Sequence, residues 1–207
     1  MLCLSVLYQG RTLPVAWAIG LAPQKGAWRP HGEAWLDRLQ GRLPADGTVR
    51  VCADRGLDAK WLFERMVQQG WHPFGRINAQ GGYRQVGQAT YHRLASVVPP
   101  AGTSWCGRVV GFKGRPQECP LLAYWGVGQS EAWLIGTDLP PAGVWVPWDA
   151  RRAGIESGFS DWKRRGWQWH RAQMKDASRA ERLALAILWG VRWCGVGRRR
   201  VWVGVRV

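Results

Sequence analysis

Residues 151–165 contain acidic and basic side chains whose spacing could bring opposite charges together at one site. Arg152, Glu156 and Lys163 are separated by four and seven residues, so on an α-helix they share one face. One carboxylate is then flanked by two cations. Taken alone, such a triplet is more often a ladder of salt bridges on a helix surface. Its meaning therefore depends on the other carboxylates of the chain.

A second candidate carboxylate, Asp54, stands 102 residues before Glu156. It directly follows the segment TVRVCA (48–53), which is rich in β-branched residues and predicts a strand. A helix is predicted near residues 57–69, with Gly70 as its natural stop. Because open α/β sheets gather their ligands at the carboxyl ends of strands, Asp54 is predicted to face a binding or catalytic site.

The rest of the chain predicts the elements that would position these two carboxylates. Residues 2–8 and 12–20 predict two strands joined by a hairpin connection, and residues 72–146 predict a series of short strands separated by Gly and Pro. Residues 196–207 match neither a helix nor a loop and are left unassigned. Apart from the helix after Asp54, helices are predicted at residues 32–43, 149–165 and 178–194.

The composition indicates a globular protein with a polyanionic partner. Lys and Arg number 29 against 14 Asp and Glu, which gives a net charge of +15. Residues 151–207 hold 14 basic and 4 acidic side chains, a net charge of +10. Nucleic acid is the first candidate partner, although a solvated helix face would give the same charge run.

Several other classes of protein are not supported. The five cysteines are odd in number and include no CxxC pair, so neither a disulfide framework nor a zinc knuckle is indicated. The four histidines show no metal-ligand spacing and are interpreted as surface or packing residues. No apolar run is long enough to span a bilayer, so we expect no membrane partner and a cytoplasmic location.

The order of these features resembles the DDE transposases of bacterial insertion sequences, in the group with a Tyr-Arg-Glu-Lys signature. Arg152, Glu156 and Lys163 fit the spacing of that signature, whereas Asp149 stands where the tyrosine would be. Several stretches over most of residues 2–190 resemble family segments and occur in the same order as in the family. This ordered set is more specific than a single motif. The stretches similar to its second and third strands, its second-aspartate motif and its C-terminal segment are YQGR (8–11) with LPVAW (13–17), ADRGLD (53–58) and RLALA (182–186).

The resemblance implies an α/β fold, in the form of an RNase H-like mixed sheet with flanking helices that lacks its first strand and carries a β-rich insertion. The implied parts are a first part of the core at residues 1–77, the insertion at 78–146, C-terminal catalytic helices at 147–195 and a basic tail of unknown structure at 196–207.

The resemblance also implies a mechanism. Asp54 and Glu156 would be the catalytic and metal-binding carboxylates for Mg²⁺ or Mn²⁺, in a phosphoryl transfer where two ions clamp the attacking and leaving oxygens. The partners would be transposon ends and target DNA, bound by a homodimer in the bacterial cytoplasm, at the nucleoid. The cations that would grip DNA phosphates are Arg152, Lys163, Arg164 and Arg165.

The first aspartate of the family lies on the strand before the hairpin, and here no Asp or Glu precedes Glu33. We therefore expect an N-terminally truncated catalytic-domain fragment with little or no transposition activity by itself. Two alternatives stay open: a non-catalytic DNA-binding remnant, and a basic RNA-associated protein in which both carboxylates are structural. Replacement of Glu156 by Gln separates them, because only an enzyme depends on that carboxylate for turnover.

Overall fold

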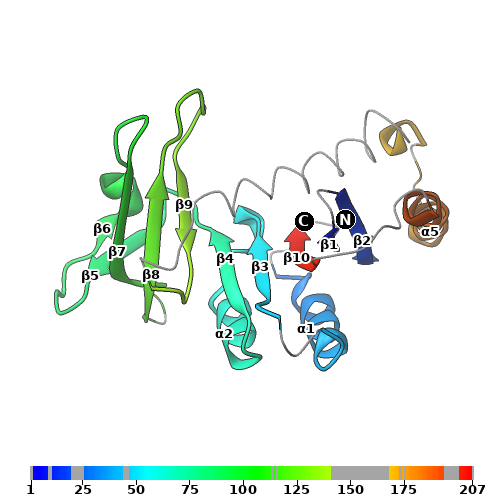
Figure 1. Ribbon diagram of the computed structural model, residues 1–207, viewed down its shortest axis with the longest axis horizontal. Helices are drawn as coiled ribbons and strands as arrows, with labels where there is room; N and C mark the ends of the chain where they lie inside the picture. The colour runs from blue at the N-terminus through cyan, green and yellow to red at the C-terminus, as the bar shows by residue number, and fades with distance from the viewer. Residues whose placement is uncertain are drawn as a thin grey trace. The chain divides into compact units, whose positions relative to one another are not determined.

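The computed structural model describes residues 2–8, 11–19, 26–43, 47–112, 114, 116–140, 168–172, 174, 176–193 and 201–206. The described chain is mixed α/β, as the sequence predicts, and its elements are drawn in Figure 1. It forms two compact units, one made of Met1–Gly47 with Pro147–Val207 and the other of Thr48–Val146.

The first unit contains the predicted N-terminal hairpin. Strand β1 (Leu2–Tyr8) pairs antiparallel with β2 (Arg11–Ala18), and a β-bulge shifts the register between Leu4 and Ser5. Side chains of β1 form the buried core here, since Leu2, Leu4 and Leu7 are each at most 5% exposed.

A third strand, β10 (Val201–Arg206), pairs antiparallel with the other edge of β1, with Cys3 opposite Arg206 and Tyr8 opposite Val201. Residues 196–207 were left unassigned from sequence, so β10 is an addition. Its alternating valines are typical of a strand, and their signal was outweighed by the run of arginines before it.

Two α-helices of this unit lie within the described residues. Helix α1 (Arg29–Leu39) begins with Pro30 in its first turn and buries Trp35 and Leu36. The helix starts earlier than the predicted residues 32–43. It also ends earlier, because Gly41 has a positive φ of 71° and breaks the helix.

Helix α5 (Ala177–Trp193) matches the predicted C-terminal helix and packs on β2. The Asp176 carboxylate caps it by accepting a hydrogen bond from the Arg179 backbone N–H at 2.7 Å. Its buried residues include Ala180, Ala184 and Ile187, while Leu185, expected in the apolar stripe, is 46% exposed. No helix within the described ranges is both long and apolar enough to cross a membrane.

The second unit is a mixed sheet, and among its described strands one pair is parallel and the other pairs are antiparallel. Strand β3 (Arg50–Ala53) runs parallel to β4 (His72–Arg76), and β4 runs antiparallel to β9 (Trp133–Gly136). The strand order is β3-β4-β9-β8-β7-β5-β6. The four strands not yet given are β8 (Gln117–Tyr124), β7 (Ser104–Gly111), β5 (Gly82–Gln85) and β6 (His92–Arg93).

The parallel pair is connected by a short 3₁₀-helix, η1 (Arg55–Leu57), and by α2 (Lys60–Gln68), which packs on β4. The sequence predicted one helix near residues 57–69. In the structure the backbone is extended at Asp58 and Ala59, and this extended segment separates η1 from α2. Gly70 ends α2 as predicted, with φ +74° and hydrogen bonds from Gly70 and Trp71 N–H to Val67 and Met66 carbonyls.

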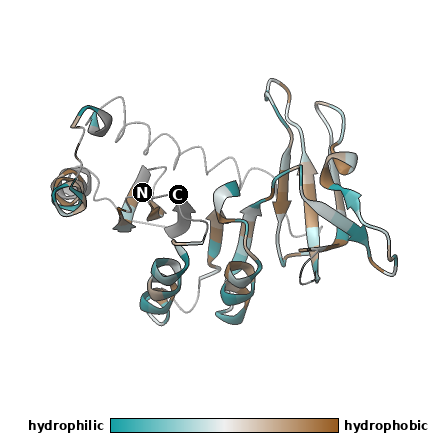
Figure 2. Cartoon of the chain, turned by 180° about the vertical axis from the view of Figure 1, so that it is seen from behind, coloured by the Kyte–Doolittle hydropathy of each residue, from teal (hydrophilic) through white to brown (hydrophobic). Residues whose placement is uncertain are grey.

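The antiparallel strands enclose their own core. Its members include Val109, Leu121 and Leu134 from three neighbouring strands, together with Leu94 from a second 3₁₀-helix, η2 (Leu94–Val97). Figure 2 shows hydrophobic residues following these strands, whereas α2 has both hydrophobic and hydrophilic sides. The sheet is therefore a packed scaffold at whose first strand the candidate site lies.

Candidate active site

Asp54 lies at the carboxyl end of β3, where the sequence predicted it. Its backbone is extended, with φ −76° and ψ 162°, and it is the N-cap residue of η1. Its Oδ1 accepts a hydrogen bond from the backbone N–H of Arg55 at 2.8 Å, and the residue is partly exposed. The strand and this hydrogen bond hold the carboxylate at the sheet edge, in contact with solvent.

The neighbouring parallel strand ends at the same edge. Ala53 of β3 pairs with Gly75 of β4, so Asp54 and Arg76 follow paired positions. Arg76 is only 7% exposed, and its guanidinium carbon lies 4.4 Å from the ring centre of Trp133. Arg76 stabilises the junction of β4 and β9 by this cation–π contact. Asp54, in contrast, is partly exposed to solvent at the end of β3.

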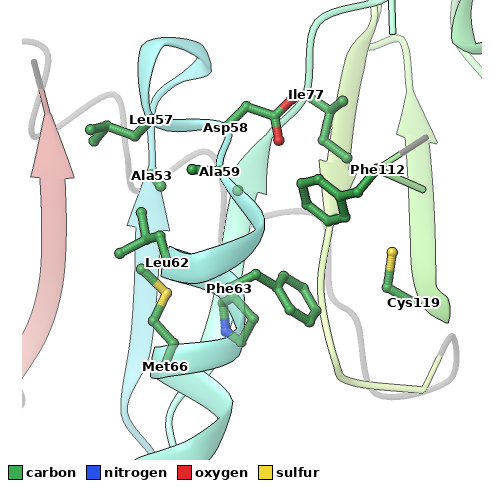
Figure 3. Close-up of a pocket in the computed structure, with 13 residues that line it drawn as sticks. Ala53, Leu57, Asp58, Ala59, Leu62, Phe63, Met66, Ile77, Phe112 and Cys119 are labelled. Carbon is green, nitrogen blue, oxygen red and sulfur yellow. The ribbon is translucent and has the colours of Figure 1, made fainter. Parts of the chain in front are cut away.

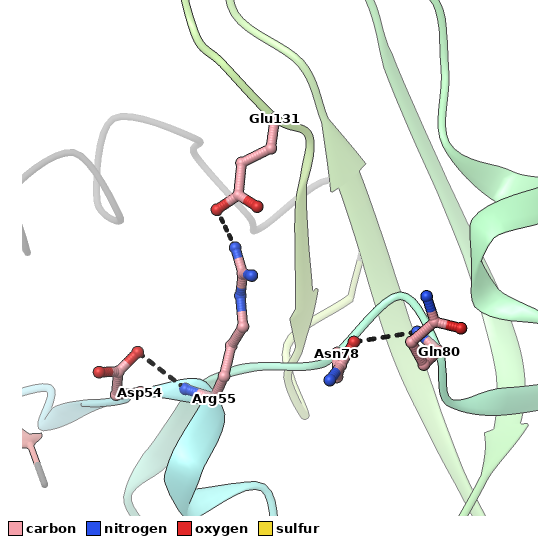
Figure 4. Close-up of polar contacts among 5 residues, drawn as sticks. All are labelled: Asp54, Arg55, Asn78, Gln80 and Glu131. Atoms are coloured by element: carbon pink, nitrogen blue, oxygen red, sulfur yellow. Dashed lines mark hydrogen bonds and ion pairs between the residues drawn. The ribbon is translucent and has the colours of Figure 1, made fainter.

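Arg55, the residue after Asp54, is ion-paired with Glu131 (Figure 4). Glu131 belongs to the loop between β8 and β9, 76 residues away in sequence. The side chains of Arg55 and Glu131 are 39% and 51% exposed. The Arg55–Glu131 ion pair thus connects the segment that follows β3 to the loop between β8 and β9.

Asp58, at the other end of η1, has a different environment from Asp54. It lies at the rim of a small pocket lined mainly by apolar side chains, among them Phe63, Ile77 and Phe112 (Figure 3). The residue keeps part of its surface in solvent, but burial of its carboxyl against these apolar walls raises its pKa to about 6.

Cys119 lines the same pocket and is 3% exposed. Burial raises the pKa of its thiol to about 11, and the negative charges of Asp58 and Glu118 add to the shift. A thiol with so high a pKa is protonated near neutral pH, so Cys119 is a packing residue and not a nucleophile.

The other site residues predicted from sequence, Glu156 with the cations Arg152, Lys163, Arg164 and Arg165, lie outside the described residues. Asp54 is the predicted site residue whose surroundings the structure defines. Its carboxylate is the hard oxygen ligand that Mg²⁺ prefers, so it fits one position of a divalent metal site. Within the described ranges, no three His, Cys, Asp or Glu side chains are grouped to hold a metal ion.

The described histidines are placed by structural contacts. His72, at the start of β4, has its Nδ1 2.9 Å from Oδ2 of Asp138, and this pair joins β4 to the end of β9. His31 lies beside Trp35, and His92 lies beside Tyr83. His31, His72 and His92 thus each have a structural neighbour in the described chain.

Sequence reasoning did not select Arg55, Asp58 or Glu131 as functional candidates. Arg55 and Asp58 lie inside the quoted motif ADRGLD (53–58), so attention to every charged residue of that motif would have found them. Glu131 had no local signal, because its significance comes from a contact across 76 positions.

Comparison with known proteins supports the resemblance on which these assignments depend. A family model described as "Transposase DDE domain" matches residues 3–190, which is most of the chain. A comparison with curated proteins gives no match. The mixed sheet with its helices agrees with the RNase H-like fold that the family implies. On the extent of this match, the chain belongs to the transposase DDE domain family.

Proposed function

We propose that this chain is a transposase catalytic domain in which Asp54 and Glu156 are the catalytic, metal-binding carboxylates. The observation that carries the proposal is the placement of Asp54 at the carboxyl end of β3, within the matched residues 3–190. There its carboxylate is oriented by the backbone of η1 and is partly open to solvent, as a ligand for an incoming cation must be.

In DNA strand cleavage and transfer, the carboxylates and the cations of the chain would have separate roles. Mg²⁺ or Mn²⁺, when bound, would supply the positive charge that stabilises the attacking and leaving oxygens. Asp54 holds its carboxylate at the strand end, and Glu156 would bring the second one to it. The cations Arg152, Lys163, Arg164 and Arg165 would bind phosphates beside the cut and so position the strand without reading its sequence.

We further propose that residues 78–146 are an insertion between the first part of the core, residues 1–77, and the catalytic helices of residues 147–195. The partners are transposon ends and target DNA, with a homodimer formed on the DNA at the bacterial nucleoid. The net charge of +15 supports a DNA partner, since phosphate contacts supply much of the affinity for nucleic acid.

Activity of the 207-residue polypeptide by itself is expected to be low. Strands β1 and β2 contain no acidic residue, so neither of them contributes a carboxylate to Asp54 and Glu156. Two carboxylates can hold a divalent cation, but the two-ion geometry of this chemistry normally uses a third. Residual nicking in Mn²⁺ is the expected activity.

A second candidate function is DNA binding without turnover. It is favoured by residues 65–117, which contain seven Lys or Arg and no Asp or Glu. This acid-free stretch includes β4, β5, β6 and β7, so binding could persist in the absence of catalysis.

Binding and nicking of the same labelled duplex DNA separate these functions. The catalytic proposal predicts preference for duplex DNA over RNA, and slow Mn²⁺-dependent nicking that Asp54→Asn and Glu156→Gln abolish while binding persists. DNA binding with no nicking under any divalent cation would favour the second candidate. Equal affinity for RNA and DNA would contradict both.

A further inference from the structure

Arg55 is the charged residue closest in sequence to Asp54, and the predicted catalytic chemistry gives it no role. Consecutive Cα atoms are about 3.8 Å apart, so a phosphate held beside the Asp54 carboxylate would lie within reach of this side chain. Its guanidinium is paired with Glu131, and both side chains are more than one third exposed.

Glu131 is presented to Arg55 by an ordered loop. Between β8 and β9, the Gly126 backbone N–H donates to Oε1 of Gln129 at 3.0 Å, and Trp125 Nε1 donates to the Gln129 carbonyl at 3.0 Å. Gly128 closes the turn with a φ of +79°. This internal bonding fixes the loop, so the position of Glu131 over Arg55 is set by the fold.

We propose that Arg55 is a DNA-phosphate-binding residue and that Glu131 occupies its guanidinium in the free protein, to be replaced by a DNA phosphate on binding. The inference rests on the proposed function, because DNA supplies the phosphate. Glu131 then lowers the affinity for DNA that engages Arg55, because the ion pair must be broken before the phosphate can bind.

The exchange is physically reasonable because both anions suit the same cation. A guanidinium presents a planar fork of N–H donors that matches the oxygens of a carboxylate and of a phosphate alike. An exposed ion pair shifts an equilibrium by at most about fivefold, so Glu131 holds Arg55 weakly enough for a phosphate to replace it. A guanidinium donates the same N–H groups to either anion, so the exchange needs no proton transfer.

The chain contains a matched control pair. Arg108 Nε lies 2.8 Å from Oε1 of Glu118, with side chains 66% and 42% exposed. This pair lies on β7 and β8, which are separated from β3 by β4 and β9 in the sheet. Neutralising Glu118 changes the net charge as neutralising Glu131 does and also releases an exposed arginine, but away from Asp54.

The test is fluorescence anisotropy of a short labelled DNA duplex, titrated with the 207-residue protein at several salt concentrations. Glu131→Gln is expected to tighten binding by about two- to fivefold, because the variant has no exposed ion pair to break before the phosphate binds. Glu118→Gln should tighten it less. Arg55→Gln should weaken binding about tenfold and lower the salt slope by about one, as loss of one phosphate contact requires.

The double variant Arg55→Gln with Glu131→Gln decides whether Glu131 acts through Arg55. If it does, the gain from Glu131→Gln disappears once Arg55 is gone, leaving only the gain seen with Glu118→Gln. Equal effects of Glu131→Gln and Glu118→Gln, or of Arg55→Gln and Arg108→Gln, would overturn the inference while leaving the proposed function intact. Absence of DNA binding by the unaltered protein would instead remove the proposed function.

Discussion

The carboxylate of Asp54 accepts a hydrogen bond from the backbone N–H of Arg55, so one side chain both ends β3 and starts η1. Asn can accept the same bond, whereas Ala cannot. We predict that Asp54→Asn changes the free energy of unfolding by less than about 0.5 kcal/mol and Asp54→Ala lowers it by about 1 kcal/mol. Urea unfolding followed by circular dichroism measures both. Equal losses in the two variants would show that the cap contributes nothing.

Asp58 predicts a pH dependence of stability. Its pKa is about 6 in the folded chain against 3.8 for the free side chain, so between these values the folded state retains a proton that the unfolded state releases. The contribution of this group is therefore greatest below pH 3.8 and is lost as the pH rises to about 6. Asp58→Asn removes this dependence.

Above the folded-state pKa, Asp58→Asn is expected to be more stable than the unaltered protein by about 1 kcal/mol, a value discounted because the residue is partly solvated. Below pH 3.8 the two proteins should be equally stable. Unfolding midpoints measured across this range give the comparison. A constant difference between the two proteins at every pH would rule out the titration of Asp58 as its cause.

The backbone conformation at the end of α2 predicts that adding a methyl group at Gly70 lowers the stability of the protein. Gly70 has a φ of +74° and open space where a Cβ would be, so Gly70→Ala meets backbone strain alone and should cost about 1 kcal/mol. Gly111, in β7, also has open space but no positive φ, and Gly111→Ala is the control. The control is expected to be neutral or slightly stabilising in chemical unfolding. Similar losses in both variants would contradict the role assigned to the Gly70 backbone.

The pairing of β10 with β1 predicts the result of removing residues 201–207. Without β10, the backbone groups that β1 presents to it lose their partners. Amide hydrogen exchange in Leu2–Tyr8 should become faster, whereas exchange in β7 and β8 should stay the same. The open edge should also increase self-association, measurable by sedimentation. Unchanged exchange in β1 would show that β10 does not protect this strand.

Much of the element order could be predicted from local patterns. The hairpin, the strand before Asp54, the stop at Gly70 and helix α5 follow from residue spacing and from glycine conformation, which act over a few positions. Strand β10 was missed because the arginines before it hide a short valine alternation. The break at Asp58 was missed because a 3₁₀ turn and an α-helix give similar patterns in a short segment.

The candidate site was predictable only in part. Asp54 could be placed because a carboxylate following a β-branched segment has a defined position at the sheet edge. The pairing of Arg55 with Glu131 could not be predicted, since it depends on how a loop 76 residues away returns to the end of β3. The raised pKa of Asp58 likewise comes from apolar side chains of separate strands. Such tertiary effects leave no periodic trace in one sequence.

Binding of Mn²⁺, followed by electron paramagnetic resonance of the free ion, tests most directly whether Asp54 and Glu156 share a metal site. Asp54→Asn and Glu156→Gln should each weaken the same site by a similar factor, and the double variant should be little weaker than either, because both carboxylates serve one ion. Glu118→Gln is the control and should bind as the unaltered protein does. Unchanged Mn²⁺ affinity in Glu156→Gln, with or without duplex DNA, would contradict the catalytic assignment.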